Sequence, residues 1–106
     1  MKPFNALADG TRREIVKILS ERGELPVAEI SRNFAITAPA VSQHLKVLRE
    51  AGVLKVRKQA QQRFYRIDEK GMEEVGGWLT EIREKWNARL DAMEQHVKEM
   101  NNKEKK

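Results

Sequence analysis

The last third of this 106-residue chain carries apolar residues at steps of three and four positions, with one repeated four-residue step. The stripe consists of Met72, Val75, Leu79, Ile82, Trp86, Leu90, Met93, Val97 and Met100. This spacing predicts a long helix with one apolar face. Since only 40% of the residues are hydrophobic, the core of one chain is small. The apolar face is therefore expected to be buried against a helix of a second chain. The alternative is that the helix folds back onto its own domain.

We therefore expect a homodimer, with the interface formed by Phe4, Leu7, Leu79, Ile82, Trp86, Leu90, Met93 and Val97. The final helix is expected to begin after a cap at Asp68 and to end near Met100, so that residues 1–100 form the domain and residues 101–106 a disordered polar tail. Gly76 and Gly77 each weaken a helix by about 1 kcal/mol relative to alanine. They leave open whether the helix is broken there.

The charge of the chain is concentrated in its middle. The formal net charge is +5, and residues 37–67 hold seven basic side chains against one acid, a net charge of +6. A polyanion is the natural partner of such a field, because each neutralised phosphate releases counterions. The alternative is a solvated basic surface without a partner.

Local signals predict the elements around this basic segment. Asp9 is expected to cap a helix that ends at Gly23, and Pro26 to lie in the first turn of a second, short helix. Thr37 is expected to cap a third helix, which ends at Gly52. Two strands should follow, at 54–56 and 64–67, joined by a polar loop from residue 58 to residue 62.

The second and third of these helices have the outline of a helix-turn-helix. With Leu45 at the centre of the buried face, Val41 and Leu48 share that face, and a small polar surface points outward. Gln43 could pair with adenine, Ser42 with a base edge or phosphate, and Lys46 with guanine or phosphate.

The strand pair immediately downstream resembles the wing of a winged helix. Lys58 and Arg63 flank its polar tip and are the best candidates for phosphate contacts, and Gln61 lies at the tip. The expected fold class is mainly α, α+β: a winged helix-turn-helix with a two-stranded β-hairpin wing and a long C-terminal dimerisation helix. Phe64 and Tyr65 are expected to pack within the wing rather than stack on bases.

The same residues carry a family resemblance. Residues 6–15, ALADGTRREI, and residues 38–54, APAVSQHLKVLREAGVL, resemble the opening and the recognition-helix signature of the ArsR/SmtB winged-helix repressors. The resemblance implies a homodimer that binds a palindromic operator in double-stranded DNA and represses transcription through the helix 37–51 and the wing 53–67. It also implies a DNA-reading surface formed by Thr37, Ala38, Pro39, Ser42, Gln43, His44 and Lys46.

Departures from the family pattern bear on metal sensing. The chain has no cysteine and only two histidines, so no metal site and no cofactor are expected. The two tryptophans on the last helix resemble the ending of the metal-independent, SdpR-like branch. Ala35 stands where glycine is common in the turn, so that backbone is either not left-handed or mildly strained.

Other classes of function fit less well. Neither histidine has a recognisable nucleophile or acid partner, so an enzyme is not expected. A protein–protein adaptor or antitoxin, and a non-specific architectural DNA binder, stay open as alternatives. No run of about 18 apolar residues and no signal-peptide pattern is present, so a cytoplasmic protein without a membrane span is expected.

Overall fold

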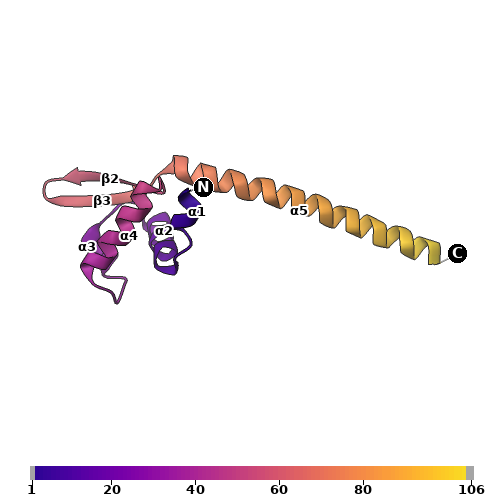
Figure 1. Cartoon of the computed structure of the whole chain (residues 1–106), viewed down its shortest axis with the longest axis horizontal. Helices are drawn as coiled ribbons and strands as arrows, with labels where there is room; N and C mark the ends of the chain where they lie inside the picture. Colours follow the sequence, from indigo (N-terminus) through magenta and orange to yellow (C-terminus); the bar gives the residue numbers. More distant parts are fainter. Residues whose placement is uncertain (1, 105–106) are drawn as a thin grey trace. The chain divides into compact units, whose positions relative to one another are not determined.

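A computed structural model describes residues 2–104 of the chain. The chain divides into a compact body, which extends to Val75, and a second unit that starts at Gly76. The elements in chain order are α1 (Lys2–Ala6), α2 (Gly10–Arg22), β1 (Leu25–Pro26), α3 (Val27–Ser31), α4 (Ala38–Glu50), β2 (Leu54–Gln59), β3 (Gln62–Ile67) and α5 (Glu69–Glu104) (Figure 1). The expected fold class, a winged helix-turn-helix with a hairpin wing and a long last helix, is confirmed.

The helix ends of the body follow their capping residues. The Asp9 carboxylate accepts a hydrogen bond from the Arg12 backbone N–H at 3.0 Å and so caps α2. Gly23 ends that helix with φ of 81°, a value that glycine adopts without strain. The Thr37 hydroxyl accepts from the Ala40 N–H at 3.3 Å and caps α4, and Gly52, with φ of 80°, follows its end. These four predictions are confirmed.

The sheet has one strand more than the sequence predicts. The hairpin β2–β3 is antiparallel, and β1 pairs with the other edge of β3, with Leu25 opposite Tyr65 and Pro26 opposite Phe64. Pro26 therefore lies in β1 and at the N-cap position of α3, where it makes no side-chain capping bond, rather than inside the first turn of that helix. A two-residue strand has no periodicity of its own, and its pairing is set by the body around it.

The hairpin is longer than expected and its turn is shorter. The strands extend to Gln59 and from Gln62, which leaves Ala60 and Gln61 as the turn in place of a loop over 58–62. Ala60 has φ of 55°, the only left-handed non-glycine backbone among residues 2–104, so Ala35 is not left-handed.

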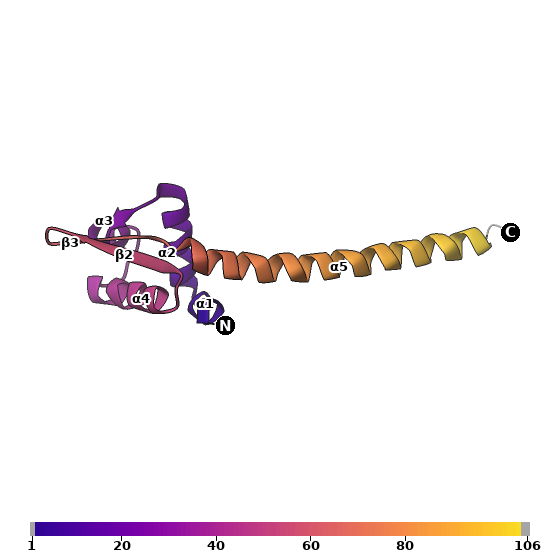
Figure 2. The same ribbon diagram turned by 90° about the horizontal axis from the view of Figure 1, so that it is seen from above.

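The core of the body lies between α2, α4 and the sheet. Its largest fully buried side chains are Ile15, Ile30, Val41, Leu45, Leu48, Val53 and Leu54. Tyr65, at 5% exposed, joins this core from β3, as expected for a packing residue of the wing. Figure 2 shows α4 running beside the hairpin, and the two elements are in contact.

The helix α5 starts as part of the body and ends later than expected. Val75 is 6% exposed, and Met72 packs against the core. Gly76 and Gly77 are helical, and the helix continues to Glu104 instead of ending near Met100. Residues 101–104 of the expected disordered tail are therefore helical, and residues 105 and 106 lie outside the described part of the chain.

Candidate nucleic-acid interface

Helix α4 has one buried face and one exposed face. Val41, Leu45 and Leu48 are each 0% exposed, because the i, i+4, i+7 spacing turns all three toward the core. The opposite face presents residues that are all exposed in the structure: Thr37, Ala38, Pro39, Ser42, Gln43 and Lys46. The small and polar N-terminal half of this face is suited to entry into a major groove.

A groove runs between α4 and the hairpin. Its lining comes from α3, α4 and β3 and consists of Val27, Pro39, Ser42, Gln43, Lys46, Arg49, Arg63 and Tyr65. The structure thus brings four predicted residues of α4, Pro39, Ser42, Gln43 and Lys46, beside one predicted residue of the wing, Arg63. Arg49 was not among the predicted site residues, although it follows Lys46 by three positions on the helix, a spacing that could have revealed it.

The pleat of the hairpin sorts its basic side chains onto two faces. Lys58 is two positions from Val56, and Arg63 is two positions from Tyr65, so Lys58 and Arg63 lie on the face of the sheet that carries the core. Lys58 is directly opposite Arg63 in the register of the strands. Like charges in this arrangement destabilise a hairpin. A bound anion such as a phosphate would relieve the repulsion.

Two of the three basic side chains of the other face, Arg57 and Lys55, are paired with carboxylates, and the third is Arg66. Arg57 binds Glu24 at 2.6 Å and stacks over the Phe64 ring at 4.6 Å, and Lys55 binds Glu69 at 3.1 Å. The hydrogen bond from Arg57 lowers the pKa of Glu24. The pKa of Glu69 is lowered first by its own backbone N–H and then by Lys55.

Five cations of the basic segment make no ion pair among residues 2–104: Lys46, Arg49, Lys58, Arg63 and Arg66. Two of them belong to α4 and three to the wing, and Lys46, Arg49 and Arg63 line the groove. The fold thus divides the cations of the basic segment into two that are paired with carboxylates and five that are not, three of which line one groove.

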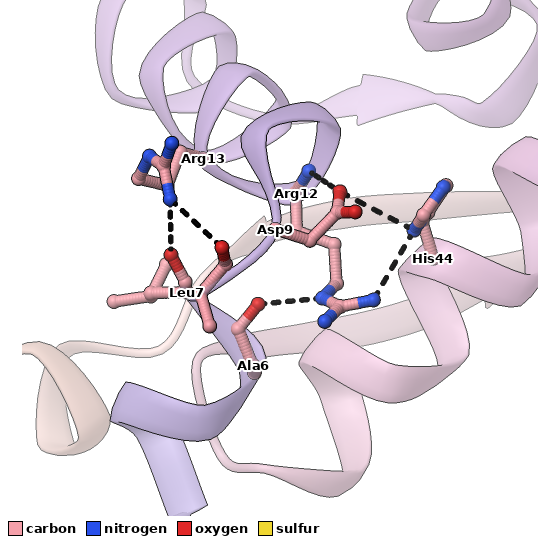
Figure 3. Close-up of polar contacts among 7 residues, drawn as sticks. Ala6, Leu7, Asp9, Arg12, Arg13 and His44 are labelled. Carbon is pink, nitrogen blue, oxygen red and sulfur yellow. Dashed lines mark hydrogen bonds and ion pairs between the residues drawn. The ribbon is translucent and has the colours of Figure 1, made fainter.

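His44 lies at the edge of the exposed face of α4, and 23% of its side chain is exposed. Its Nδ1 atom is 3.5 Å from Nη1 of Arg12 and 3.9 Å from Oδ2 of Asp9 (Figure 3). The backbone N–H of Arg12 is the main cause that lowers the pKa of Asp9, and the nearby His44 and Arg12 side chains act in the same direction. His44 is therefore held by the start of α2, a contact that links residues 32 and 35 positions apart.

The predicted partner surface differs between its two parts. Phe4 and Leu7 are half-buried in the body. The six predicted residues of α5, Leu79, Ile82, Trp86, Leu90, Met93 and Val97, are between 43% and 57% exposed. Trp78 and Met100, at 42% and 49%, extend the same apolar set and were not in the prediction.

Other sites were sought in the part of the chain that the structure describes. Among residues 2–104 there is no group of three or more His, Cys, Asp or Glu side chains that could hold a metal ion. In the same range, no helix is long and apolar enough to cross a membrane. The α4–wing groove, with three unpaired cations in its lining, is the candidate site among the described residues.

The body has the architecture of a winged helix-turn-helix DNA-binding domain, with α3 and α4 as the helix pair and β2–β3 as the wing. Residues 9–56 match the model of the arsR family of bacterial regulatory proteins. The chain is 35% identical, over 92% of its length and 80% of the relative's, to the arsenical resistance operon repressor of Escherichia coli. The chain belongs to the ArsR family, whose members are transcriptional regulators and not enzymes.

Two further similarities agree with this assignment. The HTH-type transcriptional regulator Rv2034 of Mycobacterium tuberculosis is 45% identical over 67% of this chain, and the match spans 65% of that relative, less than two thirds of its length. The crystal structure of the ArsR family transcriptional regulator RHA00566 superposes with a TM-score of 0.72 at 34% identity, covering 81% of this chain and 88% of that one.

Proposed function

We propose that this chain is a homodimeric transcriptional repressor that binds a palindromic operator, with α4 in the major groove and the wing, residues 53–67, beside it. One observation carries the proposal: the exposed N-terminal half of α4 and the unpaired cation Arg63, which lies opposite Lys58 in the hairpin, border one groove. The proposed DNA-binding set is Thr37, Ala38, Pro39, Ser42, Gln43, His44, Lys46, Arg49, Lys58, Gln61 and Arg63.

The members of this set differ in chemistry and therefore in role. Gln43 offers a donor and an acceptor on one amide, the pattern that pairs with adenine in the major groove. Lys58 and Arg63 carry only donors and positive charge, which suits them to phosphates and to setting the register of the protein on the duplex. Sequence preference is thus assigned to α4, and salt-dependent affinity mainly to the wing.

The homodimer is supported by α5. Its exposed apolar residues form one stripe, and the cost of leaving such a stripe in water is relieved when a second copy covers it. Two-fold symmetry also serves the function, because it places two copies of α4 about 34 Å apart, one turn of DNA. We propose that residues 1–100 act together as the DNA-binding and dimerisation domain.

Within the family we place the chain in the metal-independent, SdpR-like branch. The lack of cysteine in the sequence removes thiolate ligands, and Trp78 and Trp86 give the last helix the aromatic character of that branch. The proposed repressor needs no cofactor, and it acts in the cytoplasm, where the DNA is.

Competition binding tests the proposal. A genomic footprint first identifies the bound DNA, and labelled operator is then challenged with an excess of genomic competitor. A sequence-specific repressor stays on one palindrome. An architectural DNA binder is removed by the competitor, and an adaptor does not bind DNA; either result contradicts the proposal.

Three variants locate the surface. We expect Gln43→Ala to cost about 1–3 kcal/mol at one base position and to relax the preference there. Arg63→Ala should weaken binding to all sequences and reduce the salt slope by about 1. Arg57→Ala is the matched control, since Arg57 is paired with Glu24 on the other face of the hairpin. If Gln43→Ala and Arg63→Ala both leave operator binding unchanged, the proposed surface is wrong.

A further inference from the structure

Two adjacent arginines at the start of α2 have no part in the function proposed above. Arg12 Nε donates to the carbonyl oxygen of Ala6 at 2.5 Å, and Arg13 Nη1 donates to those of Leu7 and Ala8 at 2.9 and 3.1 Å (Figure 3). These carbonyls lie at and just beyond the end of α1, where a helix leaves its last acceptors without partners. Both arginines therefore stabilise the end of α1.

Of the two, Arg12 also contacts helix α4. Its Nη1 is 3.5 Å from His44 Nδ1. A guanidinium has five donors and no acceptor, so this contact is favourable only when Nδ1 presents its lone pair. Asp9 Oδ2 is 3.9 Å from the same nitrogen, beyond hydrogen-bond distance, and already accepts from the Arg12 backbone N–H. These contacts assign the neutral His44 ring its proton on Nε2.

The nitrogen that carries the proton faces away from the cluster. Figure 3 shows the second ring nitrogen of His44 on the side opposite to Arg12 and Asp9. The side chain is partly exposed and follows Gln43 directly on α4. An N–H in this place is a donor beside the proposed reading surface, and phosphate oxygens are the acceptors that line the edge of a DNA groove.

We propose that Arg12 is a positioning residue for operator binding. It holds the His44 ring in one tautomer and one orientation, so that Nε2–H donates to a phosphate oxygen of the DNA. The same guanidinium binds the Ala6 carbonyl, so one side chain joins the end of α1 to the reading helix. The inference rests on the proposed function, because it needs α4 to lie against DNA.

A spectroscopic measurement tests the first step. Nitrogen-15 NMR of the His44 ring, in the full-length protein, distinguishes the Nε2–H tautomer from the Nδ1–H tautomer. We expect the Nε2–H form to dominate in the wild type and in Arg13→Gln. Arg12→Gln should shift the ring toward a mixture of tautomers. An unchanged tautomer in Arg12→Gln overturns the assignment.

Operator affinity tests the second step through a double-mutant cycle. His44→Ala should weaken binding about tenfold, the loss of one hydrogen bond to a charged group, and Arg12→Gln about threefold or more. In the His44→Ala background, Arg12→Gln should cause no further loss. Arg13→Gln is the control: it removes a cap of α1 without touching α4, so affinity should not change. Affinity is measured at a temperature at which thermal melting shows every variant to be folded.

The outcomes separate this inference from the proposed function. Additive losses for Arg12→Gln and His44→Ala, or an equal loss in Arg13→Gln, overturn the inference. So does full affinity in His44→Ala when Gln43→Ala and Arg63→Ala still weaken binding. If Arg12→Gln, His44→Ala, Gln43→Ala and Arg63→Ala all leave binding unchanged, the proposed DNA surface itself is wrong. As a second variant, His44→Gln keeps a side-chain donor but lacks the ring, and it should retain more affinity than His44→Ala and be insensitive to Arg12→Gln.

Discussion

The body and the outer part of α5 use apolar side chains in opposite ways. In the body, seven large side chains are fully buried within one core. In residues 76–103, every residue is exposed, although this segment carries both tryptophans and six other large apolar side chains. The body is stabilised by its own packing, whereas the apolar residues of the outer helix gain their stabilisation only against another surface. The stability of the body should be independent of protein concentration, whereas the stability of the outer helix should depend on protein concentration.

The largest expected effect contrasts a leucine from each region. Leu45 is 0% exposed and Leu90 is 43% exposed. Leu45→Ala should destabilise the body by about 2–5 kcal/mol at any protein concentration, because it leaves a cavity. Leu90→Glu should leave the unfolding of the body unchanged and produce monomers. Urea denaturation at two protein concentrations measures the stability of the body in both variants, and sedimentation measures their oligomeric state. If Leu90→Glu is still a dimer, the interface does not include Leu90.

A second contrast concerns glycines on either side of the boundary between the units. A Cβ atom on Gly71 would lie within van der Waals overlap of the backbone of Gly52, at 1.9 Å from its carbonyl oxygen, whereas a Cβ on Gly76 meets nothing within 4 Å. Gly71→Ala should therefore lower the free energy of unfolding by about 1–3 kcal/mol or more.

Gly76→Ala is the matched control. It should raise helix stability by up to about 1 kcal/mol, because alanine has the higher helix propensity. Chemical denaturation of both variants measures the difference. A neutral Gly71→Ala would show that the first turn of α5 does not pack closely on Gly52.

Acid should affect the body through three carboxylates. Since the folded state lowers the pKa values of Asp9, Glu24 and Glu69, their contribution to stability is present above the unfolded pKa values. It is lost as the pH falls through the lower folded values, below about pH 4. Thermal melting between pH 6 and pH 3 should show this loss, and Glu24→Gln should show a smaller loss than the wild type. Equal pH dependence in the two proteins would exclude the Arg57–Glu24 pair as a contributor.

The smallest expected effect lies at the tip of the wing. Ala60 has left-handed backbone, which costs an L-residue about 1–2 kcal/mol and glycine far less. Ala60→Gly should stabilise the body by up to about 1 kcal/mol, after the entropy cost of glycine, and Gln61→Gly is the control that should not. Denaturation midpoints distinguish the two; a loss of stability in Ala60→Gly would contradict the turn conformation.

Much of this architecture could be predicted because its signals are local. Asp9 and Thr37 cap helices through side chains three residues from the groups they bind, and Gly23 and Gly52 end helices through their own backbone freedom. The buried face of α4 follows from the spacing of its apolar residues. The strand β1 and the two-residue turn of the hairpin could not be predicted in this way, since each depends on pairing with a distant or longer strand.

Sequence alone determined the helix order, the face of α4 that turns inward, the apolar stripe and the location of the positive charge, because propensity, periodicity and charge are properties of neighbouring residues. Only the tertiary structure decided which cations are paired, since Arg57 meets Glu24 across 33 positions while Arg63 meets no carboxylate in the described chain. It also showed why residue 71 must be glycine and how Arg12 reaches His44. These are contacts between segments far apart in the chain, and no local pattern records them.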